Sequence, residues 1–259
     1  MTSGVRDGGR REAGAGRTGG GSRTVVFDPA VYLVTDTRQC GGPDAVVRTV
    51  RAAVTGGVGM VQLRDPSATT RELAELARAL VAALAPTTVP LVVNDRADVA
   101  LAVGADGVHI GQRDLDPLST RRLVGPDLHV GLSISNADEL AEAVALPAGT
   151  VDLLGVGPIR DTPSKTDASA AVGLTGLADL TARTTLPCVA IGGLGVADAA
   201  AVRAAGAVGM AVISAICGQG DPASATERLL RAWRSVPSGG STGSPVPHHV
   251  SATGVDGRS

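Results

Sequence analysis

Short runs of β-branched and other apolar residues alternate along the chain with longer stretches rich in alanine and leucine. The short runs have the length and composition of buried β-strands, and the longer stretches carry apolar residues at helical spacing. Eight strands are predicted, at residues 31–36, 60–63, 91–94, 107–110, 129–131, 152–156, 188–191 and 209–213. The clearest helices are predicted at residues 70–84, 198–205 and 222–234.

Strand–helix alternation of this kind predicts a parallel sheet, because a crossover helix is what joins parallel neighbouring strands. Eight such units favour an α/β fold of the (β/α)₈ TIM-barrel type, and an open doubly wound sheet is the alternative. A single catalytic domain is expected at residues 25–235. Residues 1–24 and 236–259 are dominated by Gly, Ser, Thr, Arg and Pro, so both are expected to be disordered tails.

Composition limits the kinds of partner. Of the 259 residues, 44% are hydrophobic and 1% aromatic, which is enough for one core built from Ala, Val and Leu. A net charge of -2 gives no broad basic field, so nucleic acid is not expected as a partner. No apolar run is long enough to cross a bilayer and the first residues lack the apolar stretch of a signal peptide, so a cytoplasmic protein without membrane association is expected. The composition does not decide whether the chain forms a homo-oligomer.

Polar residues stand where several predicted strands end, which is where barrels carry their chemistry. Gln62 and Arg64 are two residues apart and are expected to face the same side, where one suits a heterocycle and the other a phosphate. Asn94, His109 and Ser133 follow at the ends of the next strands. Taken alone, a solvated arginine and a satisfied core histidine are the plainer interpretations of Arg64 and His109.

The last two predicted strands end in residues that suit a phosphate group. Gly192 and Gly193 follow the seventh strand, and Ile213 and Ser214 end the eighth. Backbone amides at these positions form the usual phosphate site of such barrels. A simple turn is the alternative for the glycine pair.

Two carboxylates, Asp95 and Asp114, follow different strands at the same end of the predicted barrel. Mg²⁺ is commonly held by one or two carboxylates together with substrate phosphate oxygens, so a magnesium site is predicted there. Capping is the alternative, with Asp95 at a helix near Asp98 and Asp114 in the turn before Pro117.

Lys165 is the only lysine among 23 basic side chains, and it follows Thr162, Pro163 and Ser164. An ammonium on a flexible stem, close to hydroxyl groups, suits a phosphate or pyrophosphate group. A codon bias that replaced lysine elsewhere is one alternative. A Schiff-base aldolase is another, although Lys165 lies well beyond the sixth strand in a proline-containing loop.

Taken in order, these segments resemble the thiamine-phosphate synthase family, and the resemblance covers nearly everything between the tails. The segments that carry it are VYLVTD at 31–36, VQLR at 61–64, VNDR at 93–96, GVHIGQ at 107–112, GLS at 131–133, GVGP at 155–158, TPSK at 162–165, AIGG at 190–193 and VISAI at 212–216. The family joins hydroxymethylpyrimidine diphosphate to thiazole phosphate and releases pyrophosphate. The resemblance implies Mg²⁺ as cofactor and a dissociative reaction.

The resemblance also implies a role for each matched residue. Asp95 and Asp114 would hold the metal. The pyrimidine diphosphate would be bound by Gln62, Arg64, Asn94, Ser133 and Lys165, with His109 lining the pyrimidine pocket. The thiazole phosphate would be bound by Thr162, Pro163, Ser164, Gly192, Gly193, Ile213 and Ser214. Arg64 and Lys165 would act in catalysis by stabilising the departing pyrophosphate.

One departure from the family pattern lies two residues after Arg64, where Pro66 stands in place of a lysine. We expect weaker binding of the diphosphate as a result. Two further alternatives are a thiazole tautomerase, which would carry a histidine where this chain has Ser135, and a non-catalytic protein that only binds a phosphorylated ligand.

Overall fold

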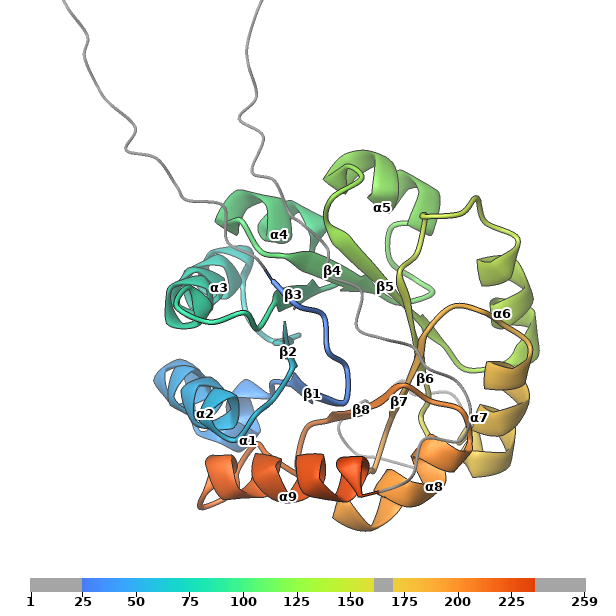
Figure 1. Ribbon diagram of the computed structural model, residues 1–259. Helices are drawn as coiled ribbons and strands as arrows, with labels where there is room; N and C mark the ends of the chain where they lie inside the picture. The colour runs from blue at the N-terminus through green and yellow to red at the C-terminus, as the bar shows by residue number, and fades with distance from the viewer. Residues whose placement is uncertain (1–24, 161–169, 236–259) are drawn as a thin grey trace, which may run out of the picture.

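The computed structural model describes residues 25–160 and 170–235, and the chain there forms a barrel of parallel strands surrounded by helices (Figure 1). The strands are β1 Val31–Val34, β2 Met60–Leu63, β3 Leu91–Asn94, β4 Gly107–Ile110, β5 His129–Ile134, β6 Leu153–Val156, β7 Cys188–Ile191 and β8 Gly209–Val212. They pair in sequence order, and β8 pairs with β1 to close the sheet. The prediction of a (β/α)₈ barrel is therefore confirmed, and the open doubly wound sheet is excluded.

The helices lie on the outside of the barrel, and all of them except α9, which follows β8, connect consecutive strands. They are α1 Thr37–Cys40, α2 Pro43–Thr55, α3 Thr70–Leu84, α4 Ala97–Val103, α5 Pro117–Val124, α6 Ala137–Val144, α7 Gly173–Ala182, α8 Ala199–Ala204 and α9 Pro222–Arg234, with a 3₁₀ turn, η1, at Val196–Asp198. The helix expected at 70–84 has those bounds because Thr69 and Glu72 form a capping box at its start. The helix expected at 198–205 begins instead with η1.

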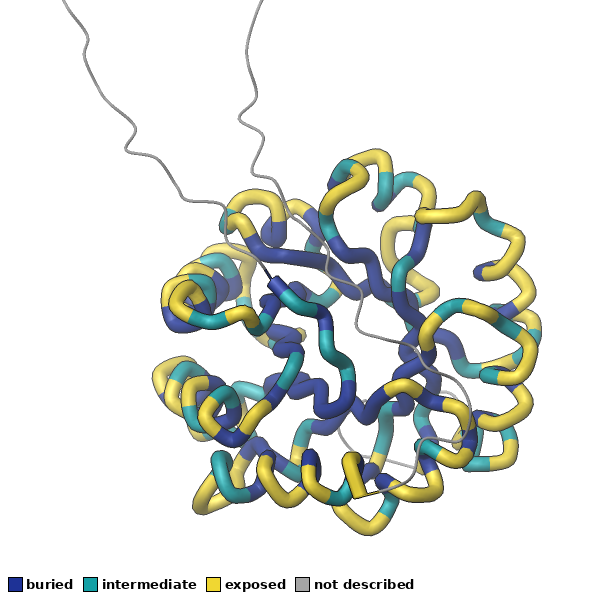
Figure 2. Tube along the Cα trace, viewed as in Figure 1, coloured by how far each residue is buried: buried dark blue, intermediate teal, exposed yellow. Residues whose placement is uncertain are grey.

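Two apolar clusters divide the core between the inside and the outside of the barrel. Val61 and Val93 belong to the larger cluster, which packs between the strands and the helices. Met60 and Val92, one position earlier on the same strands, belong to the smaller cluster inside the barrel. Figure 2 shows the buried strands at the centre and the exposed positions on the outer faces of the helices.

The amino-terminal end of the barrel is covered by the segment that precedes β1. Val25 and Phe27 are buried there and join the inner cluster, and the Phe27 ring stacks on His129 at the start of β5, with 4.4 Å between ring centroids. The opposite end, where the strands finish, is called the carboxyl rim below. The tails predicted at 1–24 and 236–259 lie outside the described residues, so their disorder stays a prediction.

None of the helices in the described part of the chain is both long and apolar enough to cross a membrane.

Candidate active site

Four of the predicted site residues lie on strands β2 to β5 at positions that face the inside of the barrel. Side chains alternate along a strand, so Gln62 and Asn94 share the inward face of Met60 and Val92. The backbone register pairs Asn94 with His109. These inward positions, close to the carboxyl rim, belong to Gln62, Asn94, His109 and Ser133.

His109 lies inside the barrel, where two glycines leave room for its ring. Its Nε2 atom is 2.9 Å from Ser133 Oγ, and the residue is 7% exposed. A Cβ atom at Gly131 would lie 2.3 Å from His109 Nδ1, and one at Gly155 would lie 3.0 Å from Cε1. Any other residue at 131 would displace the imidazole. The structure therefore fixes one His109 position and couples it to Ser133.

Gln62 is buried and its Nε2 atom donates a hydrogen bond of 3.0 Å to the Tyr32 hydroxyl. Burial raises the pKa of Tyr32, so the phenol stays protonated. The contact fixes the orientation of the Gln62 carboxamide inside the barrel. Sequence reasoning missed Tyr32 as part of the site; the signal was a lone tyrosine at an inward strand position.

Arg64 lies just beyond β2, which ends at Leu63. Its backbone N–H donates to Thr35 Oγ1 at 3.1 Å, and the Thr35 N–H donates to the Gln62 carbonyl at 2.9 Å. These bonds hold the ends of β1 and β2 together. Arg64 is partly exposed at the carboxyl rim. A charged ligand that enters from solution needs such an exposed partner.

Asp95 and Asp114 are both exposed at the carboxyl rim near the end of β4. Asp95 has a left-handed backbone, with φ of 61°, and its N–H donates to the His109 carbonyl at 2.7 Å. Asp114 Oδ2 accepts the Gly111 N–H at 2.7 Å. A non-glycine residue in this backbone region is uncommon, and such residues gather at functional sites.

The capping alternatives have different outcomes for the two carboxylates. The N-cap position of helix α4 is Arg96, not Asp95. Asp116, not Asp114, caps α5, while Asp114 closes the turn that begins at Gly111.

Within residues 25–160 and 170–235 there is no group of three or more metal-ligating side chains. Two exposed carboxylates fit Mg²⁺, which takes its other ligands from phosphate and water.

Glycines shape the rim after β7. Gly192 and Gly193 have φ values of 107° and 66°, and a Cβ atom at Gly192 would lie 2.7 Å from Pro158. Position 192 therefore requires glycine, and the left-handed backbone at position 193 favours it. After β8, the Ile213 carbonyl accepts the N–H groups of Ile216 and Cys217, which forms a turn that leaves Ser214 exposed.

The described residues do not include Thr162, Pro163, Ser164 and Lys165. The residues on either side of that segment make hydrogen bonds near the glycine pair. Before it, the Ile159 and Arg160 N–H groups donate to the Ile191 and Gly192 carbonyls at 2.8 and 3.2 Å. The Arg160 side chain also donates to the Gly193 carbonyl and pairs with Asp198. After the segment, the Val172 N–H donates to the Pro158 carbonyl at 2.8 Å. Arg160 and Val172, on either side of that segment, therefore lie close to the glycine pair.

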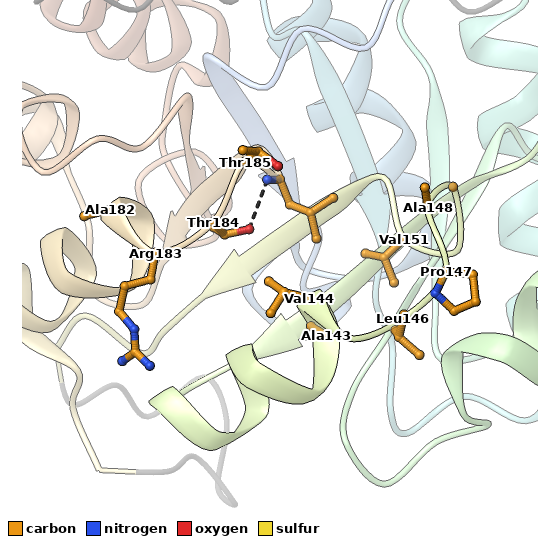
Figure 3. A pocket seen from close by; sticks show the side chains of 12 residues that line it. Ala143, Val144, Leu146, Pro147, Ala148, Val151, Ala182, Arg183, Thr184 and Thr185 are labelled. Carbon is orange, nitrogen blue, oxygen red and sulfur yellow. Dashed lines mark hydrogen bonds between the residues drawn. The ribbon is translucent and has the colours of Figure 1, made fainter.

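A hollow of about 620 Å³ lies elsewhere, at the amino-terminal end of the barrel (Figure 3). It is lined by the end of α6, the loop from Leu146 to Val151 and the loop from Ala182 to Leu186. These loops precede β6 and β7, so the hollow is at the end opposite Asp95 and His109. The hollow therefore belongs to a different part of the surface.

Comparison with known proteins decides the family. The model of the family described as thiamine monophosphate synthase matches residues 31–216. The chain belongs to this family. Thiamine-phosphate synthase of Azorhizobium caulinodans is 50% identical over 203 residues, covering 78% of this chain and 94% of that protein. That of Laribacter hongkongensis is 48% identical over 204 residues, covering 79% and 95%. The resemblance seen in the residues is confirmed.

Solved structures agree with the family. Thiamine phosphate pyrophosphorylase from Pyrococcus furiosus is 35% identical, with a TM-score of 0.71, and the match covers 80% of this chain and 96% of that one. A 3-hexulose-6-phosphate synthase is 20% identical with a TM-score of 0.58, which shows the shared barrel alone.

The structure places Ser135 and Pro66, the two positions at which the sequence was expected to depart from related patterns. The Ser135 N–H and hydroxyl both donate to Glu139, so Ser135 organises the start of α6. Pro66 is exposed in a turn in which Asp65 accepts the Ser67 N–H at 3.1 Å. Because β2 ends at Leu63, both Arg64 and Pro66 lie beyond the strand.

Proposed function

We propose that the protein is a thiamine-phosphate synthase, a transferase that joins hydroxymethylpyrimidine diphosphate to thiazole phosphate. The observation that carries the proposal is one rim that combines the inward polar layer with two carboxylates and a glycine pair. The layer consists of Gln62, Asn94, His109 and Ser133. The chain's 50% identity to a protein named for this activity supports the same reaction.

The inward layer would bind the pyrimidine. A heterocycle with an amino group and ring nitrogens needs donors and acceptors fixed in position, because unpaired polar groups in a closed site cost free energy. His109 and Ser133 form one fixed pair, and Gln62 is held by Tyr32. Asn94 lies beside His109 in the sheet register. Together they supply a preorganised polar surface at the bottom of the site.

Asp95 and Asp114 would hold Mg²⁺ through carboxylate oxygens, and Asp114 is oriented for this by the Gly111 N–H. When bound, the metal would neutralise charge on the diphosphate. Arg64 at the rim and Lys165 in the segment after β6 would stabilise the negative charge that grows on the leaving pyrophosphate.

The reaction itself requires no strong base. The bond between the methylene carbon and the diphosphate oxygen breaks, and its electron pair leaves with pyrophosphate. The electron-rich pyrimidine stabilises the carbocation, and the thiazole nitrogen donates its lone pair to the same carbon. Gly192, Gly193, Ile213 and Ser214, with Thr162, Pro163 and Ser164, would hold the thiazole phosphate so that the nitrogen faces that carbon.

One assay tests the proposal. Purified protein with both substrates and Mg²⁺ should form thiamine phosphate and pyrophosphate in equal amounts, measured by chromatography and a coupled pyrophosphate assay. Omission of either substrate is the control. Tight binding of both substrates without turnover would overturn the proposal and favour a protein that only binds phosphorylated ligands.

A further inference from the structure

Two of the three cysteines, far apart in the sequence, meet at the carboxyl rim. Cys40 ends α1, which follows β1, and Cys217 lies in the turn that follows β8. Because β1 and β8 are paired neighbours that close the barrel, these segments lie side by side. The two thiols interact with each other, and each shifts the pKa of the other. The backbones are also close, since a Cβ atom at Gly218 would lie 3.1 Å from the Gln39 carbonyl oxygen.

The two thiols have different surroundings. Cys217 is 2% exposed, with Sγ 3.8 Å from the Val34 carbonyl oxygen, whereas Cys40 is partly exposed. The contact with Cys217 lowers the pKa of Cys40, and the same contact together with burial raises the pKa of Cys217. Thiolate character and exposure decide which thiol reacts. Cys40 is therefore the thiol that reacts first, and Cys217 is the resolving thiol.

We propose that Cys40 and Cys217 form a reversible disulfide that links α1 to the turn after β8 when the protein meets a hydroperoxide. The Cys40 thiolate attacks one peroxide oxygen and the O–O bond breaks, which gives a sulfenic acid and, after protonation, one molecule of water or alcohol. The Cys217 sulfur then attacks the Cys40 sulfur. The S–O bond breaks, the S–S bond forms and one molecule of water leaves. Two thiols are oxidised and one peroxide is reduced.

Cys188 provides a natural comparison in the same chain. It is 3% exposed at the start of β7, and burial raises its pKa to about 12. A buried thiol with a raised pKa is inert towards peroxide. Cys188 should therefore stay reduced while Cys40 and Cys217 are lost together.

The disulfide would also affect the site, and this step rests on the proposed function. The Cys217 N–H donates to the Ile213 carbonyl at 2.8 Å, so the turn joins Cys217 to Ile213 and Ser214. These two residues are the ones proposed to hold the thiazole phosphate. A covalent link to α1 would fix that turn away from its reduced position. The KM for thiazole phosphate should rise severalfold on oxidation, and the KM for the pyrimidine diphosphate should change less.

The test uses the full chain treated with hydrogen peroxide. Free thiols should fall from three to one, and peptide mass spectrometry without reductant should recover residues 40 and 217 in one linked pair, which dithiothreitol releases. Cys40→Ser should keep both remaining thiols free. Cys217→Ala should stop at the Cys40 sulfenic acid, trapped with dimedone. Cys188→Ala is the matched control and should still form the link.

Several results would overturn the proposal. One is that Cys188 reacts with peroxide as fast as Cys40. Another is that the disulfide joins two chains and not two residues of one chain. A third is that the Cys217 thiol stays free while Cys40 is oxidised. These readouts need no activity, so they stand apart from the proposed reaction. If the internal disulfide forms and neither KM changes, the modification site stands and its effect on binding of the thiazole phosphate is refuted.

Discussion

Gly131 on β5 lies so close to the ring of His109 on β4 that a Cβ atom there would sit 2.3 Å from Nδ1. The register pairs these two residues directly across the sheet. The space that a side chain would fill at 131 is thus the space that the imidazole occupies. This places a bulky polar ring inside a barrel that also contains an inner cluster of apolar side chains.

The first prediction follows from this contact. Gly131→Ala should push the imidazole away from Ser133, break the 2.9 Å contact, and lower kcat/KM by roughly a hundredfold, because small displacements of site groups carry large kinetic costs. Stability should fall by about 1–3 kcal/mol from overpacking. Steady-state kinetics and thermal unfolding measure both. Gly155→Ala, with its wider 3.0 Å approach to Cε1, should cost less. Equal, small losses in both variants would contradict the assigned ring position.

The second prediction concerns the metal. Asp114→Asn keeps an acceptor for the Gly111 N–H but removes the charge, and Asp95→Asn removes the other charge. Each should raise the Mg²⁺ concentration needed for half-maximal activity by at least about tenfold. Asp127→Asn, an exposed carboxylate before β5 at the opposite end of the barrel, is the control. A Mg²⁺ titration identical to that of the unchanged protein in both site variants would rule out the assignment.

The third prediction concerns Lys165. If its ammonium stabilises the departing pyrophosphate, Lys165→Ala should lower kcat more than it raises KM, since the contact strengthens as the bond breaks. As the only lysine, Lys165 is also the sole side-chain amine for selective acetylation. Acetylation should inactivate the protein, and pyrophosphate should protect it. Full activity after stoichiometric acetylation would show that the lysine has no part in the reaction.

The fourth prediction concerns Pro66, which stands where the resemblance places a lysine. Pro66→Lys should tighten the KM for the pyrimidine diphosphate by about threefold, a modest gain because an exposed charge is screened. The competing idea is that Arg71 or Arg113, both exposed near the rim, already supplies the charge. No gain in Pro66→Lys together with a large loss in Arg71→Ala or Arg113→Ala would support that idea and refute weakened binding.

The sequence alone determined the elements and indicated one end of the barrel for the candidate site. Its apolar runs and helical stretches predicted all eight strands and the parallel barrel, because local periodicity and crossover geometry depend on neighbouring residues. Boundaries were less accurate: β5 continues to Ile134, and the first strand ends at Val34. The strand ends also indicated Gln62, Asn94, His109 and Ser133 as candidate site residues, because barrels carry their chemistry at that end.

Only the tertiary structure decided how residues from different strands meet. The Gln62 contact with Tyr32, the space that Gly131 leaves for His109, and the pairing of Cys40 with Cys217 all join distant segments. No local pattern encodes such contacts, because they depend on register and on closure of the barrel between β1 and β8. Alternation likewise does not decide where Arg64 faces, because parity is informative only while the strand continues, and β2 ends at Leu63.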